Sequence, residues 1–149
     1  MFMTKKTNKI LVGALEYCDL PELGISNMPV RVDTGATTSS LHVDNIEEFM
    51  QDGKPWVRFD IHPDTHNVDT IVTTTARLTS KKTVKSSSAD KERRVVIKTM
   101  FSLSGKKWKI KLTLTNRSSM SYLMLLGREA MKDRIIVDPS SDYIASKEI

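Results

Sequence analysis

The segment spanning residues 107–114 alternates between apolar and polar side chains without interruption. Its apolar members are Trp108, Ile110, Leu112 and Leu114, and its polar members are Lys107, Lys109, Lys111 and Thr113. Successive side chains of an extended strand point to opposite faces, so a period of two predicts a strand with one buried and one cationic face. A chain containing such a segment has to form a sheet that covers a hydrophobic core on one side.

Short strand-like runs recur along the rest of the chain. Runs rich in Val, Ile, Thr or other apolar residues predict strands at residues 9–15, 28–32, 39–43, 57–61, 70–78, 94–103, 122–126 and 135–137. Turns are expected at Gly24, Gly53 and Gly105. Two short helical segments are expected, one turn from Asp44 to Phe49 and another at residues 128–132. The pattern is typical of an all-β fold, either a small barrel or a sandwich.

The length and cysteine content limit the organisation of the chain. With 149 residues, one domain spanning residues 1–149 is expected, and residues 1–8 are interpreted as a flexible tail. Cys18 is the single cysteine, so no intrachain disulfide can form, which favours a reducing, cytoplasmic location. The apolar stretch at residues 10–15 is too short to span a membrane and lacks a clear cleavage site, so no membrane association is expected.

Charge is distributed unevenly around a net value of +5. Residues 16–69 contain eleven acidic and three basic residues, whereas residues 77–111 contain twelve basic and two acidic ones. Such a basic half is expected to attract an anionic partner, either an acidic peptide or a nucleic acid, although a solvated strand face explains it equally well. A nucleic-acid interface is the weakest of these readings, because Trp108 lies on the strand face opposite the lysines and offers no stacking platform beside them.

The tetrapeptide Asp33-Thr34-Gly35-Ala36 follows an apolar run and suggests catalysis. In an aspartic peptidase the Asp supplies a carboxylate, the Thr hydroxyl fixes the loop, the Gly brings a backbone N–H close, and a small residue leaves the cleft open. The chemistry needs two carboxylates about 3 Å apart that share one proton and activate a water. Because Asp-Thr-Gly occurs once in the chain, this mechanism requires a homodimer with both Asp33 side chains at a two-fold axis.

Several motifs in order resemble one known family over nearly the whole chain. These are VRVDTGATTSSLHV, RRVVIKT, LTNRSSM, MLLGREAM and VDPS. Together they are similar to the retropepsin-like aspartic peptidases often labelled "ATP-dependent zinc protease", a type linked to ATP-grasp glutamate ligases. The resemblance implies a closed acid-protease β-barrel, a dimeric active site and hydrolysis of peptide bonds. It also implies that Asp33 is the catalytic aspartate, that Thr34 and Gly35 complete its loop, and that residues 80–90 form a flap over the cleft.

Two departures from the family pattern keep an alternative open. Thr37 stands where the family usually has a basic or amide side chain, and Ser86-Ser87-Ser88-Ala89-Asp90 lacks the usual flap glycine. A tip without glycine is stiffer and can weaken activity. The alternative is therefore a catalytically weak or inactive module of the same fold that binds peptides.

Basic and polar residues around the motif are expected to bind the substrate. Besides Ala36, the candidates are Ser86 and Ser87 in the flap, Arg93 and Arg94 beside it, and Arg128 after the buried Gly127. Together with Lys81, Lys82, Lys85 and Lys91 they favour an acidic peptide or tail as the substrate. Arg128 has three possible roles: pairing across a dimer, binding an acidic substrate, or forming a surface salt bridge.

No metal or cofactor is expected. The sequence has no His-Glu-x-x-His, and His62 precedes Pro63, which argues against a helical pair with His66. A phosphate-binding Gly-x-x-x-x-Gly-Lys loop is also missing, so the family label's reference to zinc and ATP finds no support in this sequence.

Overall fold

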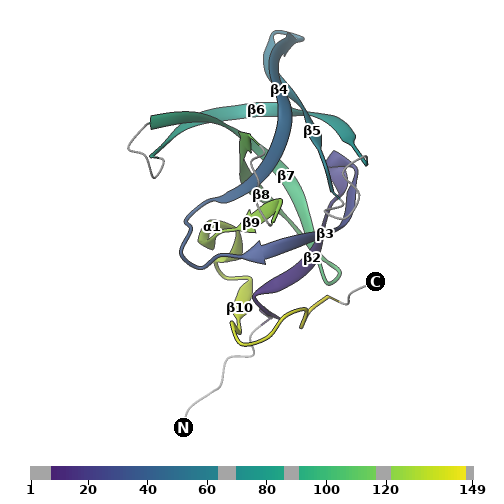
Figure 1. Ribbon diagram of the computed structural model, residues 1–149, viewed down its shortest axis with the longest axis vertical. Coiled ribbons are helices and arrows are strands. Elements are labelled where there is room, and N and C mark those ends of the chain that lie inside the picture. The colour runs from purple at the N-terminus through teal and green to yellow at the C-terminus, as the bar shows by residue number, and fades with distance from the viewer. Residues whose placement is uncertain (1–7, 64–69, 86–90, 117–121, 147–149) are drawn as a thin grey trace.

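The computed structural model describes residues 8–63, 70–85, 91–116 and 122–146 (Figure 1). The strands are β1 (Ile10–Val12), β2 (Leu15–Leu20), β3 (Ile25–Val32), β4 (Ser39–Gln51), β5 (Lys54–Ile61), β6 (Val72–Lys85), β7 (Lys91–Leu103), β8 (Lys106–Asn116), β9 (Met124–Leu126) and β10 (Ile135–Val137). Two short helices accompany them in the described part of the chain, the 3-10 helix η1 (Pro21–Leu23) and the α-helix α1 (Arg128–Met131). The expected all-β class is confirmed.

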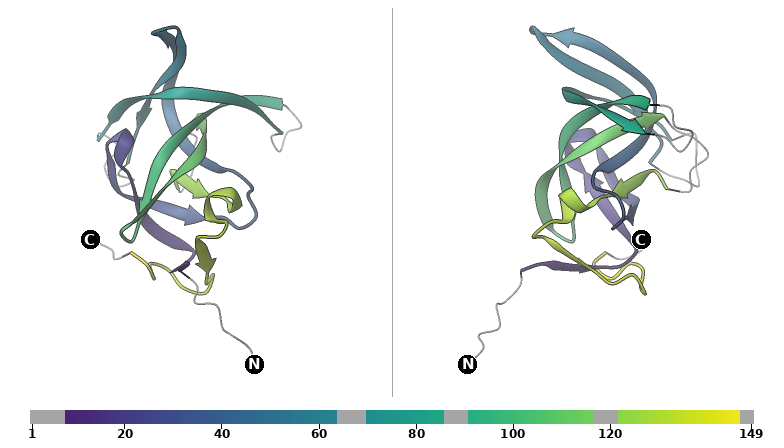
Figure 2. Two further views of the ribbon diagram at one scale, coloured as in Figure 1. Left: turned by 180° about the vertical axis from the view of Figure 1, so that it is seen from behind. Right: turned by 90° about the vertical axis from the view of Figure 1, so that its left-hand side faces the viewer.

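Eight of the strands form one sheet that curls back on itself. Their order is β2-β3-β9-β4-β5-β6-β7-β8, and further pairings of β2 with β7 and of β4 with β8 connect distant members of that order. These pairings close the sheet around a core, in line with the barrel that the resemblance implied. The other two strands, β1 and β10, pair in parallel in the lower part of the views in Figure 2.

Hairpin turns and side-chain alternation formed as the sequence predicts. Asp52 and Gly53 link β4 to β5, and Ser104 and Gly105 link β7 to β8, all four with positive φ. Two consecutive positive φ values match the right-handed twist of the flanking strands. The second residue of each turn is a glycine, which takes a positive φ without strain. In β8 the apolar residues are buried and the lysines exposed, as the period of two indicates.

The prediction of a helical turn from Asp44 to Phe49 is wrong, because β4 continues as a strand to Gln51. The sequence before Phe49 accommodates a bulge between Asp44 and Glu47, where Asn45 takes a φ of 55° and lets the strand bend. Pairing with β5 along the whole hairpin then outweighs the local signal for a cap. The hairpin projects from the barrel at the top of Figure 1.

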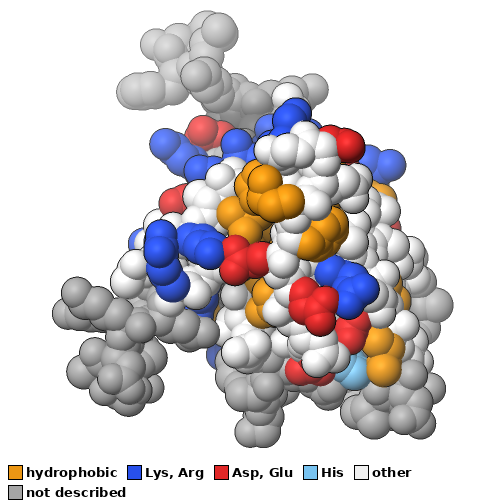
Figure 3. All heavy atoms as spheres, turned by 90° about the horizontal axis from the view of Figure 1, so that it is seen from above, with side chains coloured by type: hydrophobic (Ala, Val, Ile, Leu, Met, Phe, Trp, Pro, Cys, Tyr) orange, Lys and Arg blue, Asp and Glu red, His pale blue; other side chains and the backbone are white. Residues whose placement is uncertain are grey.

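Charged residues tie the two strands of this hairpin together. An ion pair joins Glu47 to Arg58 at 2.6 Å, and Met50 near the tip is 67% exposed. Figure 3 views the protein from above the orientation of Figure 1, and apolar patches lie between basic and acidic side chains on that face.

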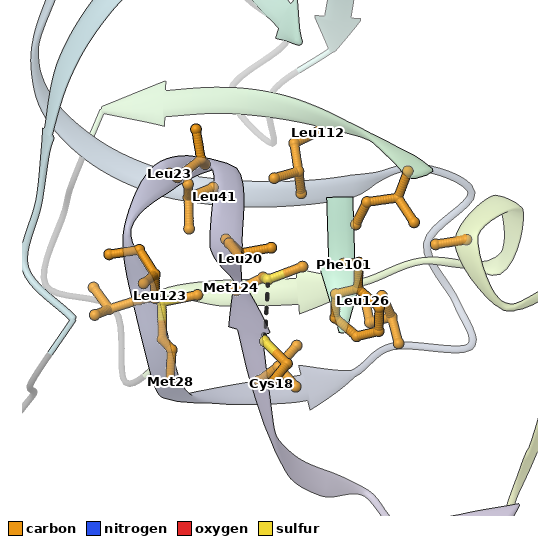
Figure 4. Close-up of a cluster of buried hydrophobic side chains, with 14 of the residues drawn as sticks. Cys18, Leu20, Leu23, Met28, Leu41, Phe101, Leu112, Leu123, Met124 and Leu126 are labelled. Atoms are coloured by element: carbon orange, nitrogen blue, oxygen red, sulfur yellow. Dashed lines mark hydrogen bonds between the residues drawn. The ribbon is translucent and has the colours of Figure 1, made fainter. Parts of the chain in front are cut away.

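The core contains the single cysteine. Cys18 on β2 is 2% exposed, and its thiol donates to the sulfur of Met124 on β9 at 3.9 Å (Figure 4). Burial raises the pKa of the Cys18 thiol, and the negative charge of Asp19 adds to this effect. The thiol is therefore neutral and inert, and it serves as a small apolar residue.

A buried carboxylate fastens the C-terminal segment to the barrel. Glu16 on β2 is 0% exposed. Its carboxylate accepts hydrogen bonds from the backbone N–H groups of Gly13, Ile144, Ala145 and Ser146 and from the Ser146 hydroxyl, at 2.6 to 3.2 Å. These donors replace the water that burial removes, so the ionised group is tolerated inside the protein.

A search of the described residues for an apolar helix of membrane-spanning length finds none.

Candidate active site

The Asp33 loop connects β3 to β4 and is held by its own backbone. The N–H of Gly35 donates to Asp33 Oδ1 at 3.0 Å, and the N–H of Ala36 donates to the Asp33 carbonyl at 3.3 Å. A Cβ at position 35 would lie 3.3 Å from Asp33 Oδ1, closer than most side-chain contacts allow. Gly35 therefore keeps the partly exposed carboxyl of Asp33 in one orientation.

The end of β9 and the start of α1 cross directly against this loop. At position 127 a Cβ would lie 2.6 Å from the carbonyl carbon of Thr38, so only glycine fits. The N–H of Gly127 donates to Ser39 Oγ at 2.9 Å, and the N–H of Asp33 donates to the Leu126 carbonyl at 2.9 Å. Two chain segments that are 88 residues apart in sequence thus fix each other's position at Asp33.

The start of α1 adds further donors to the loop. The N–H groups of Arg128 and Glu129 donate to the carbonyls of Ala36 and Thr37 at 2.8 and 2.9 Å. The Arg128 guanidinium donates to the Thr34 carbonyl and to Thr37 Oγ1, both at 2.9 Å. Arg128 therefore braces both sides of the loop tip, and its expected contact with substrate stays a prediction. Thr37, which departs from the family pattern, supplies one of the two acceptor atoms of this brace.

A cavity of about 400 Å³ opens beside the loop, between it and the outer half of the β6–β7 hairpin. It is lined by Ala36, Thr37, Thr38, Ser40, Lys82, Thr83, Arg94, Thr113 and Leu125. Lys82 lies opposite Arg94 in the β6–β7 register, and its ammonium donates to Thr38 Oγ1 at 2.7 Å. The hairpin ends project over the same side of the molecule as α1 and the Asp33 loop in Figures 1 and 2. One wall of the cavity is therefore cationic.

The sequence-predicted site residues are only partly brought together. Ala36 and Arg94 line the cavity, Thr34 and Arg128 lie in the loop brace, and Arg93 is exposed outside the cavity lining. The flap residues Ser86 and Ser87 lie outside the described residues. Sequence reasoning missed Thr38, Ser40, Thr83, Thr113 and Leu125, because their place in the cavity depends on strand register and not on residue type.

His42 follows the loop on β4 and is buried. Burial lowers the pKa of His42; the Asn116 backbone opposes this shift, and the positive charge of Arg94 adds to it. The ring is therefore neutral at pH 7, and among the described residues that line the cavity the positive charges are those of Lys82 and Arg94. Among the described residues, no group of three or more His, Cys, Asp or Glu side chains is arranged to hold a metal ion.

Comparison with known proteins assigns the family. A family model described as RimB-like, retropepsin-like aspartic endopeptidase RimB, matches residues 11–148. The chain belongs to the RimB-like family of retropepsin-like aspartic endopeptidases. The catalytic role that the resemblance implied for Asp33, Thr34 and Gly35 stays a prediction.

Relatives of this RimB-like chain include two larger bacterial proteins, both named probable alpha-L-glutamate ligase. The protein from Desulfotalea psychrophila is 46% identical over 138 residues, and that from Shewanella pealeana is 43% identical over 136 residues. The matches cover 93% and 91% of this chain but 30% of each relative, so the chain spans less than a third of their length.

A solved structure shares the fold. A crystal structure of a Legionella pneumophila protein of unknown function matches with a TM-score of 0.78 at 28% identity, and covers 93% of this chain and 99% of the other.

The brace on the Asp33 loop makes a testable prediction for Arg128→Lys. A lysine has one nitrogen in place of the two that contact the Thr34 carbonyl and Thr37 Oγ1, so it holds the loop in a less fixed geometry. We expect kcat to fall by about 10- to 100-fold with a smaller change in KM and an unchanged melting curve. Thr37→Val, which removes one of the two partners, should give a smaller loss, and Arg58→Lys on the β4–β5 hairpin should give none. An unchanged kcat with a raised KM for acidic peptides would instead assign Arg128 to substrate binding.

Proposed function

We propose that this chain is an aspartic endopeptidase that works as a homodimer, with one Asp33 from each subunit. The observation that carries the proposal is the clamped loop, in which Gly35 orients the Asp33 carboxyl and Gly127 and Arg128 fix the loop from behind. A partly exposed, oriented carboxyl is what a water-activating group requires. Because the chain has one such loop, a second subunit has to supply the partner carboxyl.

The proposed reaction needs no covalent intermediate. The two Asp33 carboxyls share one proton, and the ionised member takes a proton from a water that attacks the carbonyl carbon of the peptide bond. The protonated member donates its proton to the carbonyl oxygen, which forms a tetrahedral diol. The carboxyl that took the water proton then donates it to the leaving nitrogen as the C–N bond breaks, and one diol hydroxyl returns its proton to the other carboxyl, which restores the shared proton.

We propose acidic peptides or acidic protein tails as the substrates. Lys82 and Arg94 make the wall of the cavity beside Ala36 and Thr37 cationic, and a guanidinium is well suited to bind carboxylates. The names of the larger relatives point to glutamate chemistry, which agrees with a carboxylate-rich substrate. The lack of any possible intrachain disulfide supports action in the cytoplasm.

Mixing wild-type and Asp33→Asn subunits tests the shared site. Subunits that exchange at random with a tenfold excess of the variant should lower the wild-type cleavage rate by about tenfold, because a mixed dimer holds one carboxyl. Substrate is kept in large excess over total protein, so that binding to the variant does not deplete it. A rate that depends on the wild-type concentration alone would exclude a shared site.

The alternative is a module of the same fold that binds acidic peptides without cutting them. Thr37 and the flap sequence from Ser86 to Asp90 are the departures that favour it. Saturable binding of acidic peptides by wild type, with no cleavage products detected by mass spectrometry, would establish this alternative over the peptidase.

A further inference from the structure

A second pocket lies where β6 and β7 separate. Strand β6 pairs with β5 from Val72 to Arg77 and with β7 from Leu78 to Lys85, so β6 and β7 are separate before Leu78. Helix η1 closes part of the opening, and Glu22 Oε1 accepts a hydrogen bond from the Met100 N–H on β7 at 2.7 Å. The remaining space is a pocket of about 560 Å³, which we name the side pocket. It is lined by Glu22, Leu23, Trp56, Thr75, Ala76, Arg77, Leu78, Thr79, Lys98, Thr99 and Lys109.

Three cationic side chains surround the side pocket. Arg77, Lys98 and Lys109 have no ion-pair partner within the part of the chain that the structure describes. The one carboxylate in the lining, that of Glu22, is engaged by the Met100 N–H. The pocket therefore has an excess of positive charge in a concave site, where a bound anion is attracted by several cations at once.

A buried hydroxyl in the wall lacks a partner. Thr99 is 1% exposed, and its Oγ1 has no hydrogen-bond partner among the described residues. A buried polar group without a partner costs free energy and calls for an explanation. The Thr99 Oγ1 atom is itself closed off from solvent, so a ligand oxygen in the side pocket satisfies it only if the Thr99 side chain rotates towards the pocket.

Strand β7 contributes residues to both the side pocket and the cavity beside Asp33. Arg94 lines the cavity and Lys98 lines the side pocket, four residues further along the same strand. An even separation places both side chains on one face, about 13 Å apart. An extended peptide of about four residues spans that distance.

We propose that the side pocket is a second binding site for the same acidic peptide whose scissile bond lies at Asp33, and that it holds carboxylates about four residues from those bound by Lys82 and Arg94. This inference rests on the proposed function and adds to it. It makes the protein favour long acidic chains over short ones. Trp56, which is half-buried in the lining, contributes an aromatic wall that reports on the occupant.

Tryptophan fluorescence of the Asp33→Asn protein tests the site without cleavage. Titration with a peptide of about eight glutamates, long enough to span both sites, should give a saturable change that Trp56→Phe abolishes. Lys98→Gln with Lys109→Gln should weaken this binding by about tenfold or more. The matched control, Lys54→Gln with Lys107→Gln, removes the same charge from exposed strand positions outside both cavities and should leave the affinity unchanged.

Three outcomes would overturn the side pocket as a peptide site. They are an absent fluorescence change, equal weakening in the control pair, and saturation by inorganic phosphate at the same concentration as by the peptide. Cleavage of the same peptide by wild type is measured separately. Cleavage without the Trp56 signal overturns the side pocket alone, whereas the signal without cleavage overturns the peptidase proposal and supports the pocket as a binding site.

Discussion

Replacing Asp33 with Asn is expected to abolish peptide cleavage while the fold stays intact. The amide cannot take a proton from water, so the loss should be at least that of a missing general base, about 10²- to 10⁴-fold. The Asn carbonyl oxygen still accepts the hydrogen bond that Gly35 donates to Asp33 Oδ1 at 3.0 Å. The side chain is also partly exposed, so the substitution leaves no buried charge or cavity.

Cleavage of an acidic peptide, followed by chromatography of its products, measures this effect, and thermal unfolding checks the fold. Asp52→Asn is the matched control, because Asp52 lies in the β4–β5 turn with a φ of 53° that Asn also adopts readily. The control should cut at the wild-type rate. Wild-type cleavage by Asp33→Asn would remove Asp33 from the reaction and with it the peptidase proposal.

Replacing Glu16 with Gln is expected to be the most destabilising of the changes considered for this chain. The buried carboxylate accepts from the N–H groups of residues 13, 144, 145 and 146 and from the Ser146 hydroxyl, and the Gln NH₂ would instead point a donor at these donors. We expect a loss of about 2 to 4 kcal/mol in the free energy of unfolding. Glu47→Gln is the control, since its exposed ion pair with Arg58 is worth less than about 1 kcal/mol.

The same carboxylate predicts how stability depends on pH. Burial alone would raise the pKa of Glu16, but the hydrogen bonds from Gly13, Ser146 and Ala145 outweigh it and hold the pKa below its ordinary value of 4.5. A lowered pKa in the folded state means that the stabilisation is complete above pH 4.5 and is lost as the pH falls through the folded value.

Denaturant unfolding between neutral and acidic pH measures this dependence. Glu16→Gln should be less stable than wild type at neutral pH and should show a shallower decline in acid. Equal stability of the two proteins at neutral pH would contradict the role given to Glu16.

Local features of the fold were predictable from the sequence. The alternation in β8 and the turns at Gly53 and Gly105 depend on neighbouring residues, and they formed where predicted. The turn expected after Asp44 failed for the opposite reason, because pairing with β5 outweighed a local helix signal. The motif at Asp33 was found from its residues, but the cavity lined by Lys82 and Arg94 was not, since it depends on how β6 and β7 are placed over the loop.

By itself the sequence determined the all-β class, the Asp-Thr-Gly tripeptide at residues 33–35 and the separation of acidic and basic segments, since each follows from residue types at short spacing. Only the tertiary structure decided that Gly127 packs on Thr38, that Arg128 braces the Asp33 loop and that Glu16 holds the C-terminal segment. It also decided that β6 and β7 separate to form the side pocket. These contacts join residues far apart in the chain, and strand register sets them, which short-range patterns do not encode.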